Sequence, residues 1–488
     1  MQLRSAAAAA LTALLLMTGC SQGSTEPPPP TGGPFEWAAF GNNSRVQTGH
    51  LEVPLDYSDP SKGTVDLFVA RHVAKASKRI GSLLVNPGGP GFGGSDFAIQ
   101  AEKVYSKALL DRFDIIGWDP RGTGLTTPAI DCTEDYDHFF GTQDITPDDD
   151  AERAAGVALA QEFADDCIAA DGDVLPYIGT NNTARDMNAI RAALGEAKIS
   201  YFGFSYGSEL GATWATMFPD TVRAAVLDGA VDPTAGYVEA GLQQMEGFEG
   251  ALTTFLDRCS ADDECAFHNG GQADTAFDAL MSSLDANPLP SADGRPPVNL
   301  TIAIAGVNQA MYTSALWPQL EKALADAQDG DGAGLLALYD MYFDRSPDGT
   351  HGNGLEAFQA IYCMDHAERL TVAEEDARVP EFLAVAPRVA PATVGSYSCT
   401  FFPPSTDPRI AITGAGAGPI LVMGTTGDSA TPLAGTKRMA DTLQDGRLVI
   451  VTGDQHTGYD VNNCSRSAVD EYLIDPVGHA PADGTECR

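Results

Sequence analysis

One five-residue stretch constrains the fold of this chain more than any other. Gly203-Phe204-Ser205-Tyr206-Gly207 matches the pattern G-x-S-x-G and ends a short apolar run, residues 199–204, that is typical of a buried strand. Residues 209–218, just beyond it, favour a helix. A strand that turns sharply into a helix leaves little room for side chains, which explains the two glycines. The context predicts such a turn with Ser205 at its tip. The alternative is a glycine-rich turn with an incidental serine.

Similar apolar runs recur along the chain and alternate with helical stretches. This alternation predicts an α/β fold with a mainly parallel sheet. The first two runs are joined by a tight turn at residues 59–63, so we expect them to pair antiparallel. Strands are expected at residues 46–54, 64–73, 82–86, 113–119, 199–204, 223–228, 420–424 and 447–452, and helices at 148–171, 183–194 (capped by Asn182 or Thr183) and 209–218.

Residues 233–405 break this rhythm. They contain helical stretches at 246–259, 275–284 and 317–328, separated by connections rich in Pro, Gly and Asp. We therefore expect a largely helical cap inserted into the sheet domain. The sheet domain would then consist of residues 36–232 and 406–488.

An aspartate and a histidine follow the last two predicted strands. Asp428 comes soon after residues 420–424, and His456 soon after residues 447–452. Strands of a parallel sheet end at a common edge, so both side chains are expected beside Ser205. His456 would accept the serine proton, and Asp428 would orient the imidazole. His479, in a tail rich in Pro and Gly, and Asp454 are the rival candidates.

A glycine-rich loop after residues 82–86 suits the stabilisation of an oxyanion. Gly88 and Gly89 leave the backbone bare, so an amide of one of them could approach a developing negative charge. The second donor is expected to be the backbone N–H of Tyr206. The pattern does not decide between Gly88 and Gly89.

The same loop has a competing interpretation. Residues 89–94 also match G-x-G-x-x-G, and Asp119 ends the next strand, where an acid could bind a ribose. A dinucleotide enzyme is disfavoured because Pro87 and Pro90 remove amide donors from the loop. That interpretation also leaves Ser205, Asp428 and His456 unexplained.

The N-terminus predicts export. Residues 1–20 combine Arg4 with an apolar run that is too short to span a membrane, followed by small residues and Cys20. Met17-Thr18-Gly19-Cys20 resembles a lipoprotein processing site, which would leave Cys20 lipidated; the alternative is a plain secretory signal. Residues 21–35 form a polar, Pro-rich tether. The expected location is the outer face of a bacterial cell membrane, or the surrounding medium.

The other cysteines fit an oxidising compartment. Eight remain after Cys20, and an even set in an exported chain predicts disulfides. Local loop closure favours four neighbouring pairs, although eight cysteines allow about 105 connectivities. No CxxC spacing occurs, so a metal site is not expected. The favoured pairs are Cys132 with Cys167, Cys259 with Cys265, Cys363 with Cys399, and Cys464 with Cys487.

The net charge of −38 argues against a nucleic-acid partner, because phosphates require Lys and Arg surfaces. An acidic surface usually serves solubility.

Several motifs together resemble those of secreted tripeptidyl and prolyl aminopeptidases, which are serine peptidases of the α/β-hydrolase fold. The resemblance covers about residues 36–488 and implies a triad of Ser205, Asp428 and His456 beneath a helical cap. Thr431 would support the acidic loop by hydrogen bonding, or would simply form the turn before Pro432. The matching segments are residues 87–91, 118–124, 203–207, 226–233, 428–432 and 453–456.

The chain departs from many relatives at Ser208-Glu209, where they carry Thr and an aromatic residue. Glu209 lies one helical turn from Ser205 and could bind a substrate α-amine, or form a structural ion pair or hydrogen bond.

The resulting hypothesis is an exported serine hydrolase that releases tripeptides or single residues from peptide N-termini through an acyl-enzyme. It would need no metal or organic cofactor. An ester hydrolase with the same triad is the alternative, and a substrate-binding lipoprotein is an alternative of another class. The sequence leaves the oligomeric state open.

Overall fold

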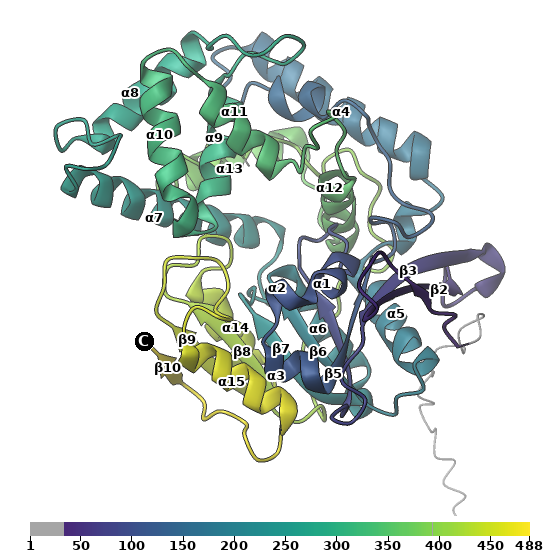
Figure 1. The fold of residues 1–488 in the computed structure, drawn as a ribbon. Coiled ribbons are helices and arrows are strands. Elements are labelled where there is room, and N and C mark those ends of the chain that lie inside the picture. Colours follow the sequence, from purple (N-terminus) through teal and green to yellow (C-terminus); the bar gives the residue numbers. More distant parts are fainter. Residues whose placement is uncertain (1–33, 393) are drawn as a thin grey trace, which may run out of the picture.

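A ten-stranded sheet forms the base of the computed structural model, which describes residues 34–392 and 394–488 (Figure 1). Cys20 and the tether up to residue 33 lie outside the described residues. The strand order is β1-β2-β3-β5-β4-β6-β7-β8-β9-β10. The strands are β1 Ala38–Ala39, β2 Val46–Pro54, β3 Thr64–His72, β4 Gly81–Asn86, β5 Phe113–Trp118, β6 Ile199–Phe204, β7 Val222–Asp228, β8 Ile420–Thr425, β9 Gly446–Val451 and β10 Thr485–Cys487.

The sheet is antiparallel from β1 to β5 and parallel from there to β10. β4, β5, β6 and β8 are buried along their whole length, as expected for strands covered on both faces. The fold class expected from the sequence is confirmed: this is an α/β-hydrolase fold with a mostly parallel sheet. Because β6, β7, β8 and β9 run parallel, the segments after them meet at one edge.

Helices cover both faces of the sheet. Leu210 and Trp214 of α6 and Met439 of α14 belong to the apolar core of one face, and Leu109 and Tyr472 to that of the other. The first face carries α5 Thr180–Ala193, α6 Tyr206–Met217 and α14 Leu433–Thr442, and the second carries α1 Ser95–Ile99, α2 Ala101–Val104, α3 Lys107–Arg112 and α15 Asn463–Ile474.

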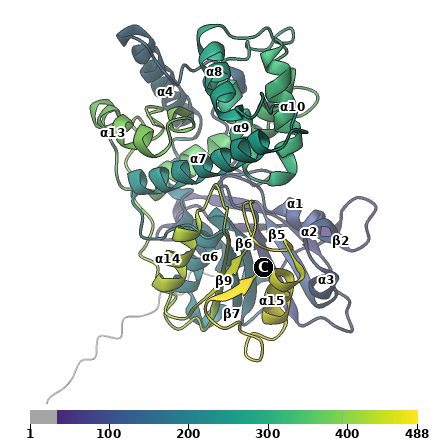
Figure 2. The same ribbon diagram turned by 90° about the vertical axis from the view of Figure 1, so that its left-hand side faces the viewer.

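The chain between β7 and β8 forms a helical cap above the carboxyl edge of the sheet (Figure 2). Its core is separate from those of the sheet faces and includes Phe255, Leu320 and Tyr339. The cap helices are α7 Tyr237–Ala261, α8 Ala273–Ala286, α9 Leu300–Met311, α10 Trp317–Gln328, α11 Ala333–Tyr342, α12 Gly354–Asp365 and α13 Val372–Val385. Short helical turns lie at Pro60–Lys62, Asp137–Gly141, Leu175–Tyr177, Pro219–Thr221, Ser314–Leu316 and Ala390–Ala392.

A segment from the first half of the chain also joins the cap. In Figure 1, α4 Asp150–Asp171 lies beside the cap helices rather than against the sheet. The turn before it is held by Asp137, which binds Arg295 at 2.7 Å, and Arg153 of α4 pairs with Asp376 of α13. The cap therefore draws on more of the chain than residues 233–405.

Five of the six expected helices begin at other residues, and α7 differs most: it starts at Tyr237, nine residues before Glu246. The N-cap of α5 is Gly179, not Asn182 or Thr183, which lie buried inside the helix. α6 begins at Tyr206, directly after the serine, three residues before the expected start. Ser205 alone connects β6 to α6, so the short loop that the sequence implied between this strand and this helix is absent.

Four disulfides join Cys132 to Cys167, Cys259 to Cys265, Cys363 to Cys399 and Cys464 to Cys487. These are the pairs that local loop closure favoured. They fit an exported protein, because disulfides persist in oxidising compartments. Within residues 34–392 and 394–488, no helix combines the length and apolar character that crossing a membrane requires.

Candidate active site

Ser205 occupies the single-residue turn between β6 and α6. Its backbone has φ 55° and ψ −126°, a conformation that costs a non-glycine residue about 1–3 kcal/mol. Its N–H donates to the carbonyl oxygen of Asp228, at the end of β7, over 2.8 Å. The neighbouring strand thus holds the serine in its strained conformation.

The glycines around Ser205 are required by close packing. A Cβ at Gly203 would lie 2.3 Å from the carbonyl oxygen of Gly207. A Cβ at Gly207 would lie 2.9 Å from Oδ1 of Asn86, at the end of β4. Both contacts are shorter than carbon–oxygen packing allows, so the turn between β6 and α6 can close only with glycine at these positions.

His456 lies on the loop after β9 and is bound by Asp428 from the loop after β8. Nδ1 of His456 is 2.8 Å from Oδ1 of Asp428 and 3.0 Å from Oδ2. The carboxylate also accepts the N–H of Thr431 at 2.8 Å and the N–H of Thr457 at 3.2 Å. The Thr431 hydroxyl lies 3.1 Å from Asp428 Oδ2 and 3.3 Å from His456 Nδ1. These groups therefore fix the orientation of the Asp428 carboxylate, which binds the imidazole of His456.

The environment of His456 favours its protonated form. Burial alone would lower the pKa of His456, but the charge of Asp428, its hydrogen bond and the more distant Asp228 together raise it above 6.5. Nε2 is buried and binds no other group of the described chain. This nitrogen is the one left to exchange a proton, since Nδ1 is held by Asp428.

The structure adds Asp228, to which sequence reasoning gave no role of its own. It is fully buried, and its carboxylate accepts the N–H groups of Gly458 at 2.7 Å and Tyr459 at 2.8 Å. Burial raises its pKa to about 7, against the opposing effect of those two hydrogen bonds. The only sequence signal for Asp228 was its position, as an acidic residue at the end of a buried strand near the two loops that carry candidate residues.

The glycine-rich loop after β4 packs directly against the serine. Gly88 has φ +104°, and a Cβ there would lie 2.6 Å from the carbonyl oxygen of Phe204 and 2.8 Å from Cβ of Ser205. The N–H of Gly88 donates to Oδ1 of Asn86 at 2.9 Å. Within the described residues, the N–H groups of Gly89 and Tyr206 donate to no protein acceptor. Between the two glycines, Gly89 is the one with an N–H free to bind an oxyanion.

The dinucleotide alternative finds no support in the same loop. The carboxylate of Asp119 accepts the N–H of Ser95 at 3.0 Å and that of Leu125 at 2.9 Å, and it is buried. It therefore holds two loops together and does not offer a free acid for a ribose.

Glu209 does not offer a free carboxylate either. It is buried and forms an ion pair with Arg409, whose Nη2 lies 3.0 Å from Nε2 of His366. Burial and the neighbouring Arg409 lower the pKa of His366 to about 4, so it accepts this hydrogen bond as a neutral ring. The geometry corresponds to the ion-pair alternative, so the carboxylate that could have bound a substrate amine is already neutralised.

The rival candidates lie elsewhere. His479 follows α15, is exposed, and lies 3.3 Å from Asp475. Asp454 forms an ion pair with Arg258 of α7. Neither rival joins the group formed by Asp428 and His456.

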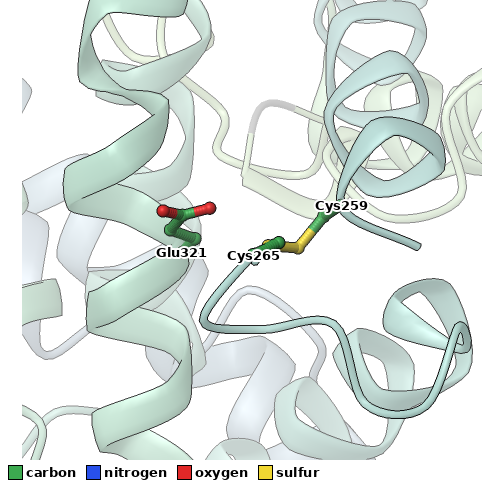
Figure 3. Close-up of side chains that lie close together, drawn as sticks. All are labelled: Cys259, Cys265 and Glu321. Carbon is green, nitrogen blue, oxygen red and sulfur yellow. A yellow bond between two sulfur atoms is a disulfide. The ribbon is translucent and has the colours of Figure 1, made fainter. Parts of the chain in front are cut away.

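One cluster has the composition of a metal site. Among the described residues, Cys259, Cys265 and Glu321 bring potential ligand atoms within 4.8 Å of one another (Figure 3). The two sulfurs share a disulfide, however, and so are not the thiolates that bind metal ions.

The fold and this site define the class of protein: an α/β-hydrolase with the elements of a serine hydrolase. Residues 81–269 match the model of the alpha/beta hydrolase fold, and residues 388–487 match that of TAP-like proteins. The chain belongs to the TAP-like family of α/β-hydrolase serine peptidases.

Three relatives illustrate the range of the family. The chain is 35% identical to the serine protease Hip1 of Mycobacterium tuberculosis, over 98% of this chain and 96% of that one. It is 34% identical to carboxylesterase B of the same organism, with 91% and 88% covered. It is 30% identical to the tripeptidyl aminopeptidase of Streptomyces lividans, with 91% and 83% covered.

The packing of Gly88 predicts a strong effect of one methyl group. Gly88→Ala should lose about 1–2 kcal/mol of unfolding free energy through its positive φ and about 1–3 kcal/mol through the contact with Phe204. Gly63→Ala is the matched control, because Gly63 has φ +117° but no atom within 4 Å of the new Cβ. Chemical unfolding should show a clearly larger loss for Gly88→Ala; equal losses would contradict the close packing.

Proposed function

We propose that this protein is an exported serine peptidase that removes short units from peptide N-termini through an acyl-enzyme. Ser205 is the nucleophile, His456 the general base and acid, and Asp428 the group that orients the imidazole. The observation that carries the proposal is the arrangement of His456, bound to Asp428 through Nδ1 and with Nε2 left unpartnered. The strained backbone of Ser205 at the end of β6 supports it further.

The chemistry follows from these positions. Nε2 of His456 removes the Ser205 proton as Oγ attacks the substrate carbonyl, and the imidazolium that forms is stabilised by Asp428. The N–H groups of Gly89 and Tyr206 bind the oxyanion of the tetrahedral intermediate. His456 then protonates the leaving amine, and the C–N bond breaks. Water, deprotonated by His456, hydrolyses the acyl-enzyme and restores the serine.

The names of the relatives support a peptide substrate. One is a serine protease and one a tripeptidyl aminopeptidase, each aligned over more than 90% of this chain. The carboxylesterase relative supports the second candidate, an ester hydrolase with the same residues. A buried Asp428–His456 pair and a strained Ser205 have no evident use in a substrate-binding lipoprotein, so that alternative is disfavoured.

The location proposed is the outer face of the cell membrane, through a lipid on Cys20. The four disulfides support export, and the segment Met17-Thr18-Gly19-Cys20 supports lipidation. The Pro-rich tether would hold the folded domain away from the membrane surface.

Ser205→Ala tests the proposed nucleophile. It should reduce kcat by about 10⁴–10⁶-fold and abolish covalent labelling by a fluorophosphonate, while the protein stays folded by circular dichroism. Mass spectrometry of products from a mixed peptide library identifies the reaction of the wild-type enzyme. Free N-terminal tripeptides or single residues support the aminopeptidase; hydrolysis of esters without any peptide cleavage would favour the second candidate. Wild-type turnover by Ser205→Ala would reject both.

The raised pKa of His456 predicts the pH dependence. The base must be neutral to accept the serine proton, so kcat/KM should fall as pH falls through the pKa of His456, with a midpoint above pH 6.5. Asp428→Asn removes the charge that favours the imidazolium, and so should move the midpoint to lower pH while lowering the rate. A wild-type midpoint at or below pH 6.5 would contradict the proposed role of Asp428.

Cys20→Ser tests the anchor. The wild-type protein should appear in the membrane fraction of expressing bacteria, and the variant in the soluble extracytoplasmic fraction. Ser21→Ala, a neighbouring change outside the processing segment, should remain with the membranes. Equal distribution of Cys20→Ser and wild type would reject lipidation.

A further inference from the structure

Asp228 connects the two loops that carry the proposed nucleophile and base. Its backbone carbonyl oxygen accepts the Ser205 N–H at 2.8 Å. Its carboxylate accepts the N–H groups of Gly458 and Tyr459, which follow His456 by two and three residues. One residue thus contacts both sides of the site from a strand that lies between them in the sheet.

The backbone after Asp228 also touches the imidazole. Gly229 has φ +65°, and a Cβ there would lie 3.0 Å from Cε1 of His456 and 3.2 Å from the hydroxyl oxygen of Thr431. Its N–H donates to the carbonyl oxygen of Met423 in β8 at 2.9 Å. The segment Asp228-Gly229 is therefore fixed between the histidine, the nucleophile and the strand that precedes Asp428.

Among the described residues, no lysine or arginine pairs with the carboxylate of Asp228. The charged groups of the described chain that face it are His456 and Asp428. A fully buried carboxylate is costly unless it is hydrogen-bonded or paired with a cation. The hydrogen bonds come from Gly458 and Tyr459, and the cation appears when His456 takes the serine proton.

We infer that Asp228 is a positioning residue that holds the His456 loop and the Ser205 turn in register and whose negative charge favours the imidazolium formed during acylation. The inference rests on the proposed triad of Ser205, Asp428 and His456. Asp228 touches neither the substrate nor the reacting atoms, and acts through His456 and Ser205. Because burial raises its pKa to about 7, part of this support is lost when the pH falls below neutrality.

Asp228→Asn is the direct test, with a chromogenic ester as substrate so that the result does not depend on peptide preference. It should lower kcat by about 10–100-fold, as loss of an outer supporting group commonly does, with little change in KM. It should also move the acidic limb of kcat/KM to lower pH, since a negative charge near His456 has been removed. An unshifted limb would overturn the inference.

Thr425→Val is the matched control. The Thr425 hydroxyl donates to the carbonyl oxygen of Gln455, directly before His456, so this change loosens the same loop without altering charge. The acidic limb should stay at its wild-type position even if kcat falls. A shift equal to that of Asp228→Asn would show that loop position alone sets the pKa of His456, and would reject the charge effect.

The wild-type enzyme provides a further test, which does not depend on whether a variant folds. If both neutral His456 and ionised Asp228 are required, the acidic limb of log kcat/KM should become steeper than a one-proton titration. A one-proton limb throughout would contradict the loss of support from Asp228 below neutrality. Ser205→Ala, assayed in parallel, separates the two proposals: an active Ser205→Ala enzyme rejects the triad, whereas an inactive one beside an unshifted Asp228→Asn rejects only the role of Asp228.

Discussion

The strained backbone of Ser205 is the constraint on which the rest of the site depends. Its positive φ costs about 1–3 kcal/mol and persists only where the surroundings fix it. The N–H of Ser205 is bound to Asp228 of β7, and glycines at 203 and 207 let β4, β6 and α6 come together around it. The same strand, through the carboxylate of Asp228, fixes the loop that carries His456. The serine and the histidine are thus positioned by one element of the sheet.

The cap contributes to this positioning as well as covering the site. The N–H of His456 donates to the carbonyl oxygen of Tyr312 at 2.8 Å, and the amide of Gln244 donates to the carbonyl oxygen of Ala430, in the acidic loop, at 3.3 Å. The oxyanion loop packs so closely on the start of α12 that a Cβ at Gly91 would lie 2.2 Å from the carbonyl oxygen of Gly354. Each loop of the candidate site therefore touches the cap, which makes the cap part of its rigid frame.

The features predicted correctly were those that depend on a local pattern of residues. Residues 46–54 and 199–204 form strands with the expected bounds, because a short apolar run between turn signals has few other uses in an α/β protein. The partners of Glu209 and Asp228 could not be predicted. Arg409 lies far along the chain from Glu209. The N–H groups that bind Asp228 belong to the backbone, so they do not constrain which residue types stand there. Helix α9 was not predicted: residues 300–311 are largely apolar and mostly buried, so composition alone does not separate such a segment from a buried strand.

The arrangement also bears on how one family includes a protease, an aminopeptidase and a carboxylesterase. Most contacts that orient Ser205, Asp428 and His456 come from strand ends and backbone groups of the sheet domain, and the cap adds the bond from the N–H of His456 to Tyr312. The chemistry proposed for these three residues is common to amides and esters. The ion pair with Arg409 neutralises Glu209, the acid of α6 that could have bound a substrate amine. Because the cap lies above the carboxyl edge of the sheet (Figure 2), we expect discrimination between substrates to arise there. Variation in the cap can change what is cleaved while the strand ends beneath it keep the reaction unchanged.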